Sequence, residues 1–143
     1  LAIVHGDYRI DNMVFDADAD VQAVLDWELC TLGDPLADLG LLLVYWVQPG
    51  EDTSFMLSGT PTLAEGMPSR EHLLERYAAG SGADVSEISF YVAFGYWKLA
   101  CIAEGIYARY SAGAMADEDV SLEDLAGQVP ALARAALAAT EQL

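Results

Sequence analysis

An almost wholly apolar run from Leu36 to Val47 places the strongest constraint on how this chain can fold. The run follows Asp34-Pro35, which offers an N-cap residue and then a proline at the first helical position. A helix that is apolar on every side is buried in a folded protein. Because spanning a bilayer takes about 20 such residues, the run is too short to cross a membrane. We therefore predict a buried helix here.

A β-hairpin is predicted before this helix. Asn12–Phe15 and Val21–Leu25 are short, apolar and rich in valine, and the residues between them favour a turn. The three aspartates of this turn imitate the start of an EF-hand loop, but valine occupies the sixth position and Trp27 the twelfth. An EF-hand needs glycine and glutamate at those two positions. The aspartates are therefore expected to form a solvated turn.

Helical patterns follow the hairpin. Residues 48–68 have no periodicity and are expected to form a long loop, of the kind that is a lid, a binding loop or disordered. Helices are expected over 70–79, 86–111 and from 121 to 143, where Pro130 either kinks the last one or begins a second segment. The fold class is thus α+β and mainly α, a short β-hairpin followed by a helical bundle. Three aromatic side chains are expected in the core: Trp27, Tyr96 and Trp97.

Charge and composition exclude several classes of function. The 143 residues carry 23 acidic and 6 basic side chains, for a formal net charge of -17. So acidic a surface repels phosphate backbones, and the basic residues are scattered, which argues against nucleic-acid binding. No basic segment followed by an apolar one opens the chain, so secretion has no visible signal and a cytoplasmic location is expected.

Two polar clusters lie at the same end of the predicted hairpin. His5–Asn12 leads into its first strand, and Asp26–Glu28 follows its second. Antiparallel strands lie about 4.8 Å apart, so this arrangement brings Asn12 and Asp26 close together. One carboxamide and several carboxylates around one point form the oxygen-rich ligand set that Mg²⁺ prefers. We predict a divalent-cation site at this end of the hairpin.

The same residues carry a family resemblance. The strings HGDYRIDN, VLDWELCTLGDPLADLG and YWKLACIAEGIYARY resemble the aminoglycoside phosphotransferase and choline kinase family, which is similar to protein kinases. They look closest to the phosphotransferase-like domains fused to acyl-CoA dehydrogenases. The resemblance implies that residues 1–143 form a protein-kinase-like C-terminal lobe. It also implies ATP and Mg²⁺ as cofactors and phosphate transfer to a hydroxyl group of a small molecule.

The resemblance implies a role for each polar residue of the two clusters. Asp7 would be the catalytic base that accepts the proton of the substrate hydroxyl. Asn12 and Asp26 would hold Mg²⁺ on the ATP phosphates. Arg9 would stabilise charge near the transferring phosphate, and Glu28 would reach the metal through water.

Four further residues are expected near the site or on the long helix. The resemblance implies that His5 is structural and bonds backbone near the metal-binding aspartate. Asp38 stands in an otherwise apolar helix and needs a buried partner, and the resemblance implies that it bonds the catalytic-loop backbone. Lys98 and Arg109 are three helical turns apart and share one helix face. They either form salt bridges with nearby carboxylates or bind an anionic group of the substrate.

Parts of a complete kinase are missing before His5. No glycine-rich loop, no lysine on a third strand and no acidic partner helix precedes it. We expect the N-terminal nucleotide-binding lobe to be absent from this chain, so that the missing lobe is itself a partner. The exposed lobe interface would then favour self-association. Two acceptor classes stay open, a hydroxyacyl compound and an aminoglycoside. The alternative function is a non-catalytic fragment that acts as a binding or interaction module.

Overall fold

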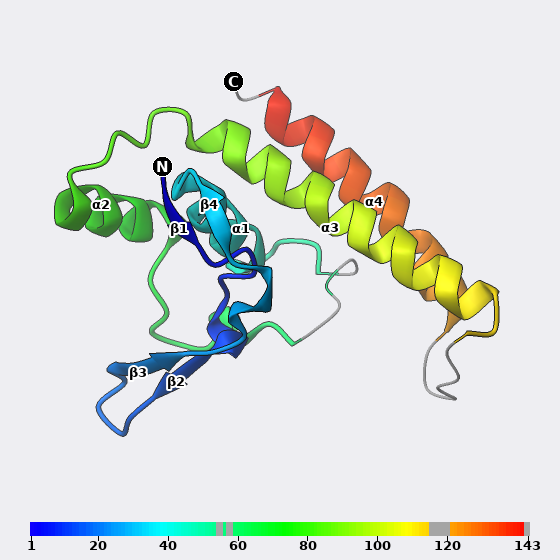
Figure 1. Cartoon of the computed structure of the whole chain (residues 1–143), viewed down its shortest axis with the longest axis horizontal. Coiled ribbons are helices and arrows are strands. Elements are labelled where there is room, and N and C mark those ends of the chain that lie inside the picture. The colour runs from blue at the N-terminus through cyan, green and yellow to red at the C-terminus, as the bar shows by residue number, and fades with distance from the viewer. Residues whose placement is uncertain (54–55, 57–58, 115–120, 142–143) are drawn as a thin grey trace.

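The computed structural model describes residues 1–53, 56, 59–114 and 121–141. Four short strands and four α-helices follow one another along these residues (Figure 1). The strands are β1 (Ala2–Val4), β2 (Met13–Phe15), β3 (Val21–Val24) and β4 (Thr31–Gly33). The helices are α1 (Leu36–Tyr45), α2 (Arg70–Ser81), α3 (Ile88–Ser111) and α4 (Leu122–Thr140). Single turns of 3₁₀-helix lie at Ile10–Asn12, Trp27–Leu29 and Pro61–Leu63.

The strands form two separate antiparallel pairs. β2 and β3 form the predicted hairpin, with Met13 opposite Val24, and it projects away from the helices in Figure 1. The second pair joins β1 to β4, with Ile3 opposite Leu32. The sequence analysis did not predict this second pair. The two polar clusters lie between the paired strands: His5–Asn12 connects β1 to β2, and Asp26–Glu28 lies between β3 and β4. The two strand pairs therefore hold each cluster at both ends.

α1 lies at the centre of the helical part, as its apolar sequence predicts. Its residues Leu41 and Val44 are buried in one cluster with Leu99 and Ala103 of α3 and Leu132 of α4. A second cluster joins the other side of α1 to apolar side chains of α2 and the start of α3. α3 and α4 run antiparallel along each other in Figure 1. The helical bundle of the predicted fold class is therefore present, and it packs around α1.

Two glycines let α1 and α3 approach each other closely. A Cβ atom on Gly40 of α1 would lie 2.5 Å from the backbone carbonyl of Tyr91 in α3. A Cβ on Gly95 of α3 would lie 3.1 Å from a methyl group of Val44. Because any larger side chain at Gly40 collides with backbone, the distance between these two helices depends on it.

Some boundaries and burial predictions differ from the structure. α2 continues to Ser81 and stops at Gly82, whose φ of 70° is left-handed. α4 passes through Pro130 as one helix, so Pro130 does not begin a new segment. Trp27 and Trp97 are 47% and 57% exposed, so the prediction that they lie in the core is wrong. Packing partners, which local pattern does not specify, decide the burial of these rings.

The prediction that the apolar run after Pro35 is a buried helix and not a membrane span agrees with the structure, where α1 spans Leu36–Tyr45. Among the described residues, no helix combines the length and apolar character needed to cross a bilayer.

Candidate active site

The segment from His5 to Asn12 is held by side chains of two helices. The Asp38 carboxylate of α1 accepts the backbone N–H groups of His5, at 2.6 Å, and Gly6, at 2.9 Å. The Lys98 ammonium of α3 donates to the carbonyl oxygen of Gly6. Gly6 has a φ of 84°, and a Cβ there would lie 2.6 Å from the carbonyl oxygen of Leu29. Only glycine fits this position without strain. Asp38 thus has the backbone partners that the sequence analysis expected.

His5 connects the two polar clusters from a position that is 2% exposed. Its Nδ1 accepts the backbone N–H of Asp7 at 3.2 Å, and its Nε2 lies 2.7 Å from the carbonyl oxygen of Leu25. Since Nδ1 acts as the acceptor, Nε2 carries the proton and donates it to Leu25. The ring centroids of the Trp27 indole and the His5 imidazole lie 4.7 Å apart. One neutral imidazole therefore fixes the backbone on both sides of the site.

Asp7 and Asn12 are in direct contact. The Asn12 Nδ2 donates to the backbone oxygen of Asp7 at 2.8 Å and to its Oδ2 at 3.0 Å. These bonds orient the Asp7 carboxylate. They also leave the amide oxygen of Asn12 as the atom that can ligate a cation.

Asp26 lies next to Asn12 through the backbone. The N–H of Leu25 donates to the Asn12 carbonyl oxygen at 2.8 Å, and Asp26 follows directly. Asp26 has φ 64° and ψ 55°, a left-handed conformation that aspartate tolerates better than most residues. Its side chain is exposed, as is that of Glu28 in the 3₁₀ turn that follows. The chain turns sharply at the residue expected to ligate the metal.

The donor atoms suit a hard cation. Within the part of the chain that the structure describes, no three His, Cys, Asp or Glu side chains cluster closely enough to hold a metal by themselves. A cation here needs the amide oxygen of Asn12 in addition to the carboxylates of Asp26 and Glu28. Amide and carboxylate oxygens are ligands that Mg²⁺ accepts, usually together with water and substrate phosphates. The residues present therefore fit Mg²⁺.

Arg9 lies beside the site and is tied to two neighbours. It forms an ion pair with Asp11, and its guanidinium carbon lies 4.4 Å from the ring centroid of Tyr45. Burial alone lowers the pKa of Arg9, but the hydrogen bond with Asp11 and the interaction with Tyr45 outweigh it and raise the pKa. Arg9 is a permanent cation of fixed orientation two residues from Asp7.

The two cations of α3 have different surroundings, although they share a helix face. Lys98 is partly buried and contacts a backbone carbonyl of the loop His5–Asn12, not a carboxylate. Arg109 is exposed. The ion pairs among the described residues are Arg9 with Asp11 and Arg70 with Glu51, so neither α3 cation takes part in one.

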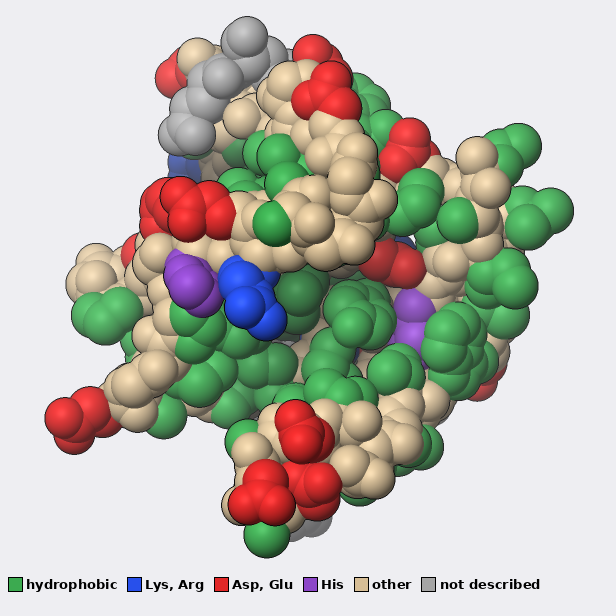
Figure 2. All heavy atoms as spheres, turned by 90° about the vertical axis from the view of Figure 1, so that its left-hand side faces the viewer, with side chains coloured by type: hydrophobic (Ala, Val, Ile, Leu, Met, Phe, Trp, Pro, Cys, Tyr) green, Lys and Arg blue, Asp and Glu red, His purple; other side chains and the backbone are tan. Residues whose placement is uncertain are grey.

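A cavity of about 320 Å³ opens beside the loop His5–Asn12. Figure 2 shows this face of the molecule, where hydrophobic side chains gather around a central hollow and acidic side chains lie above and below it. Burial and the Asp38 carboxylate raise the pKa of Tyr8, so its hydroxyl stays protonated and can donate a hydrogen bond. The lining comes from the loop, α1 and α2: Tyr8, Pro35, Asp38, Leu39, Leu42, Leu73 and Tyr77. Sequence reasoning missed this cavity because its walls lie far apart in the chain.

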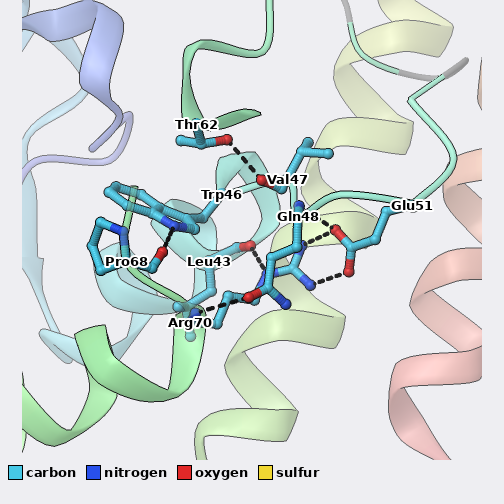
Figure 3. Close-up of polar contacts among 8 residues, drawn as sticks. All are labelled: Leu43, Trp46, Val47, Gln48, Glu51, Thr62, Pro68 and Arg70. Atoms are coloured by element: carbon cyan, nitrogen blue, oxygen red, sulfur yellow. Dashed lines mark hydrogen bonds and ion pairs between the residues drawn. The ribbon is translucent and has the colours of Figure 1, made fainter. Parts of the chain in front are cut away.

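A separate group of polar contacts around Arg70 anchors the long loop between α1 and α2 (Figure 3). The Arg70 Nε donates to the carbonyl oxygen of Leu43 at 2.8 Å, and its Nη2 lies 2.9 Å from a carboxylate oxygen of Glu51. The Trp46 indole donates to the Pro68 carbonyl oxygen at 2.8 Å. Both ends of the loop are thus bound to the end of α1.

The comparison with protein families places this fold, with its paired polar clusters, in a known family. Residues 1–91 match the phosphotransferase enzyme family, so this chain belongs to that family.

Known proteins resemble the chain over most of its length. "Acyl-CoA dehydrogenase family member 11" of Gallus gallus is 37% identical over 99% of this chain, and its human counterpart is 38% identical over 82%. The chain covers only 19% and 15% of these two proteins. A crystal structure of a "putative aminoglycoside phosphotransferase" from Ralstonia eutropha superimposes with a TM-score of 0.77 and 31% identity. That match covers 98% of this chain and 43% of the other.

Proposed function

We propose that this chain supplies the catalytic lobe for ATP- and Mg²⁺-dependent phosphoryl transfer to a hydroxyl group of a small molecule. The observation that carries the proposal is the contact of Asn12 with both catalytic segments. Its side chain bonds the Asp7 carboxylate, and its backbone bonds Leu25, the residue before Asp26. Asn12 thus links the candidate base to the segment that carries Asp26, which supports the proposal.

In the proposed reaction, Asp7 accepts the proton of the acceptor hydroxyl. The acceptor oxygen forms a bond to the γ-phosphorus as the bond from that phosphorus to the ADP oxygen breaks. Asn12 orients the Asp7 carboxylate through its Oδ2. A base positioned in this way contributes about 10²- to 10⁴-fold to the rate. Arg9, held by Asp11 and Tyr45, offers positive charge to the transferring phosphate.

Asn12 and Asp26 would hold Mg²⁺, with Glu28 reaching it through water. When bound, the ion neutralises charge on the ATP phosphates. His5 and Asp38 act on the backbone and set where these ligands stand.

We also propose that the lobe works with an N-terminal nucleotide-binding lobe outside this chain. Two observations support this. The chain spans 43% of the length of the Ralstonia protein. The β1–β4 pair presents Ile3 and Leu32 side by side, each 71% exposed. Burying such a pair against a second lobe is favourable, and an isolated lobe would self-associate through it.

The cavity beside Tyr8 favours a hydroxyacyl compound as the acceptor. Its wall is mostly aliphatic and aromatic, with few polar groups, which suits a hydroxyl on an apolar chain. An aminoglycoside is the second candidate, because the net charge of -17 attracts polycations.

The test uses the full-length protein that contains this lobe. ADP release is measured with MgATP and a panel of hydroxy acids, their CoA esters, choline and aminoglycosides. We expect turnover with one class. Asp7→Asn and Asp26→Asn should each lower kcat by about 10²-fold or more, whereas Asp18→Asn in the exposed hairpin turn should not. The proposal would be contradicted if none of the acceptors in the panel supported turnover, or if an Asp26→Ala protein kept normal turnover. ATP binding without turnover would instead support the non-catalytic module.

A further inference from the structure

Lys98 reaches from the middle of α3 to the catalytic loop, across 92 positions of sequence. Its partner there is the carbonyl oxygen of Gly6. The side chain is half-buried on a helix whose neighbouring residues Leu99 and Ala100 belong to the core. A partly buried ammonium group needs an acceptor, and this carbonyl provides one.

The packing of α3 on α1 sets where Lys98 stands. Gly95 lies one helical turn before Lys98 and rests against Leu41 and Val44 of α1. On the α1 side, Asp38 is two residues before Gly40, the other close-approach glycine. The crossing of the two helices therefore presents a carboxylate and an ammonium to the same short stretch of backbone.

Gly6 and Asp7 share a peptide unit that is bonded at both ends. Lys98 donates to its carbonyl oxygen, and its N–H, which belongs to Asp7, donates to the Nδ1 of His5. The preceding N–H of Gly6 is bound by Asp38. A bond from a charged donor is stronger than a neutral one and polarises the amide, which strengthens the N–H bond at the other end.

We propose that Lys98 is a positioning residue for Asp7: by clamping the Gly6 carbonyl it fixes the peptide plane from which the Asp7 side chain projects. The inference rests on the proposed function in one respect, that Asp7 is the base. In this proposal Lys98 acts through the backbone and is not a ligand of ATP or of the acceptor. Its loss should therefore reduce kcat and leave the KM for MgATP nearly unchanged.

The test compares three variants of the full-length protein. Lys98→Met keeps the chain length but removes the charge and the donor. Lys98→Arg keeps both. Arg134→Met removes a cation from an exposed position of α4 and is the matched control. Each variant is measured for phosphoryl transfer to whichever acceptor the panel of the proposed function identifies, and for hydrogen exchange at the Asp7 amide. Thermal unfolding reports whether each variant is folded. If Lys98→Met does not fold, Lys98→Gln, which keeps a neutral hydrogen-bond donor, replaces it.

For Lys98→Met we expect kcat to fall about 10- to 100-fold with the KM for MgATP within about twofold, as for a misplacement of the base by about 1 Å. The Asp7 amide should exchange about tenfold faster or more, because a charge-assisted bond in its peptide unit is lost. Lys98→Arg should recover much of both, and Arg134→Met should resemble the parent protein. The proposal is wrong when the folded Lys98→Met protein keeps the parent's Asp7 exchange rate, or when Lys98→Arg is as impaired as Lys98→Met.

The two readouts separate this proposal from the proposed function. A parent protein without any transferase activity overturns the proposed function. The exchange rate of the Asp7 amide then still decides whether Lys98 holds the peptide.

Discussion

Replacing Asp38 with asparagine tests how the helical core sets the geometry of the loop His5–Asn12. The carboxylate accepts two backbone N–H groups, at 2.6 Å from His5 and 2.9 Å from Gly6. Asparagine has almost the same shape but only one acceptor oxygen. Its amide NH₂ would face one of the two N–H groups, donor against donor.

The size of the effect follows from those two bonds. A hydrogen bond to a charged group contributes about 1.5–3 kcal/mol, and a neutral one about 0.5–1.5 kcal/mol. Losing one bond and weakening the other should lower the free energy of local opening by about 2–4 kcal/mol. At about 1.4 kcal/mol per factor of ten, the His5 and Gly6 amides should exchange about 30- to 1,000-fold faster.

Hydrogen exchange of the full-length protein, resolved at residues 5 and 6, measures this directly. Asp34→Asn is the control, because Asp34 is exposed, lies just before the same helix and accepts the N–H of Leu36 at 3.0 Å instead of those of residues 5 and 6. We expect little change at residues 5 and 6 in the control. Exchange at His5 and Gly6 that stays within about threefold of the parent in Asp38→Asn would refute the reasoning. Activity should fall together with protection, since the same loop carries Asp7.

Two further predictions concern packing and the long loop. Gly40→Ala should destabilise the protein by about 1–3 kcal/mol or more, because its Cβ would lie 2.5 Å from the Tyr91 carbonyl. Gly127→Ala, on α4 with no atom within 4 Å of the added methyl, should instead be neutral or slightly stabilising; equal melting temperatures for the two variants would contradict this. Arg70→Met should speed proteolysis of the loop between α1 and α2, and Glu51→Gln should add little to it since the two residues pair. Additive effects of these two changes would show that the pair does not anchor the loop.

The hairpin and the helices could be predicted because their signals are local. Valine-rich runs around an Asp-rich turn, and Ser69 before α2, act within a few residues of themselves. The β1–β4 pair could not, because it joins Ile3 to Leu32 and both face solvent. Neither strand carries an alternating pattern long enough to indicate a partner.

The same contrast applies to the site. Asp38 could be assigned a partner, because a carboxylate inside an apolar helix must be satisfied when folded. Lys98 is likewise a lone charge in an apolar stretch of α3, but in so acidic a chain it suggested a carboxylate partner or an anionic substrate group. Its actual partner, the Gly6 carbonyl, lies 92 positions away and has no signal in the sequence. The Arg70 cluster and the cavity beside Tyr8 depend on how α1 and α2 pack, which the sequence alone does not specify.

The most direct test of the account is a crystal structure of the full-length protein with Mn²⁺ and a non-hydrolysable ATP analogue, with the metal located by its anomalous signal. We predict a metal bound by the amide oxygen of Asn12 and the carboxylate of Asp26, with metal–oxygen distances of about 2.0–2.2 Å and the Asp7 carboxylate facing the terminal phosphate. A metal that binds the nucleotide without either residue, or an Asp7 carboxylate turned away from the phosphate, would contradict the account.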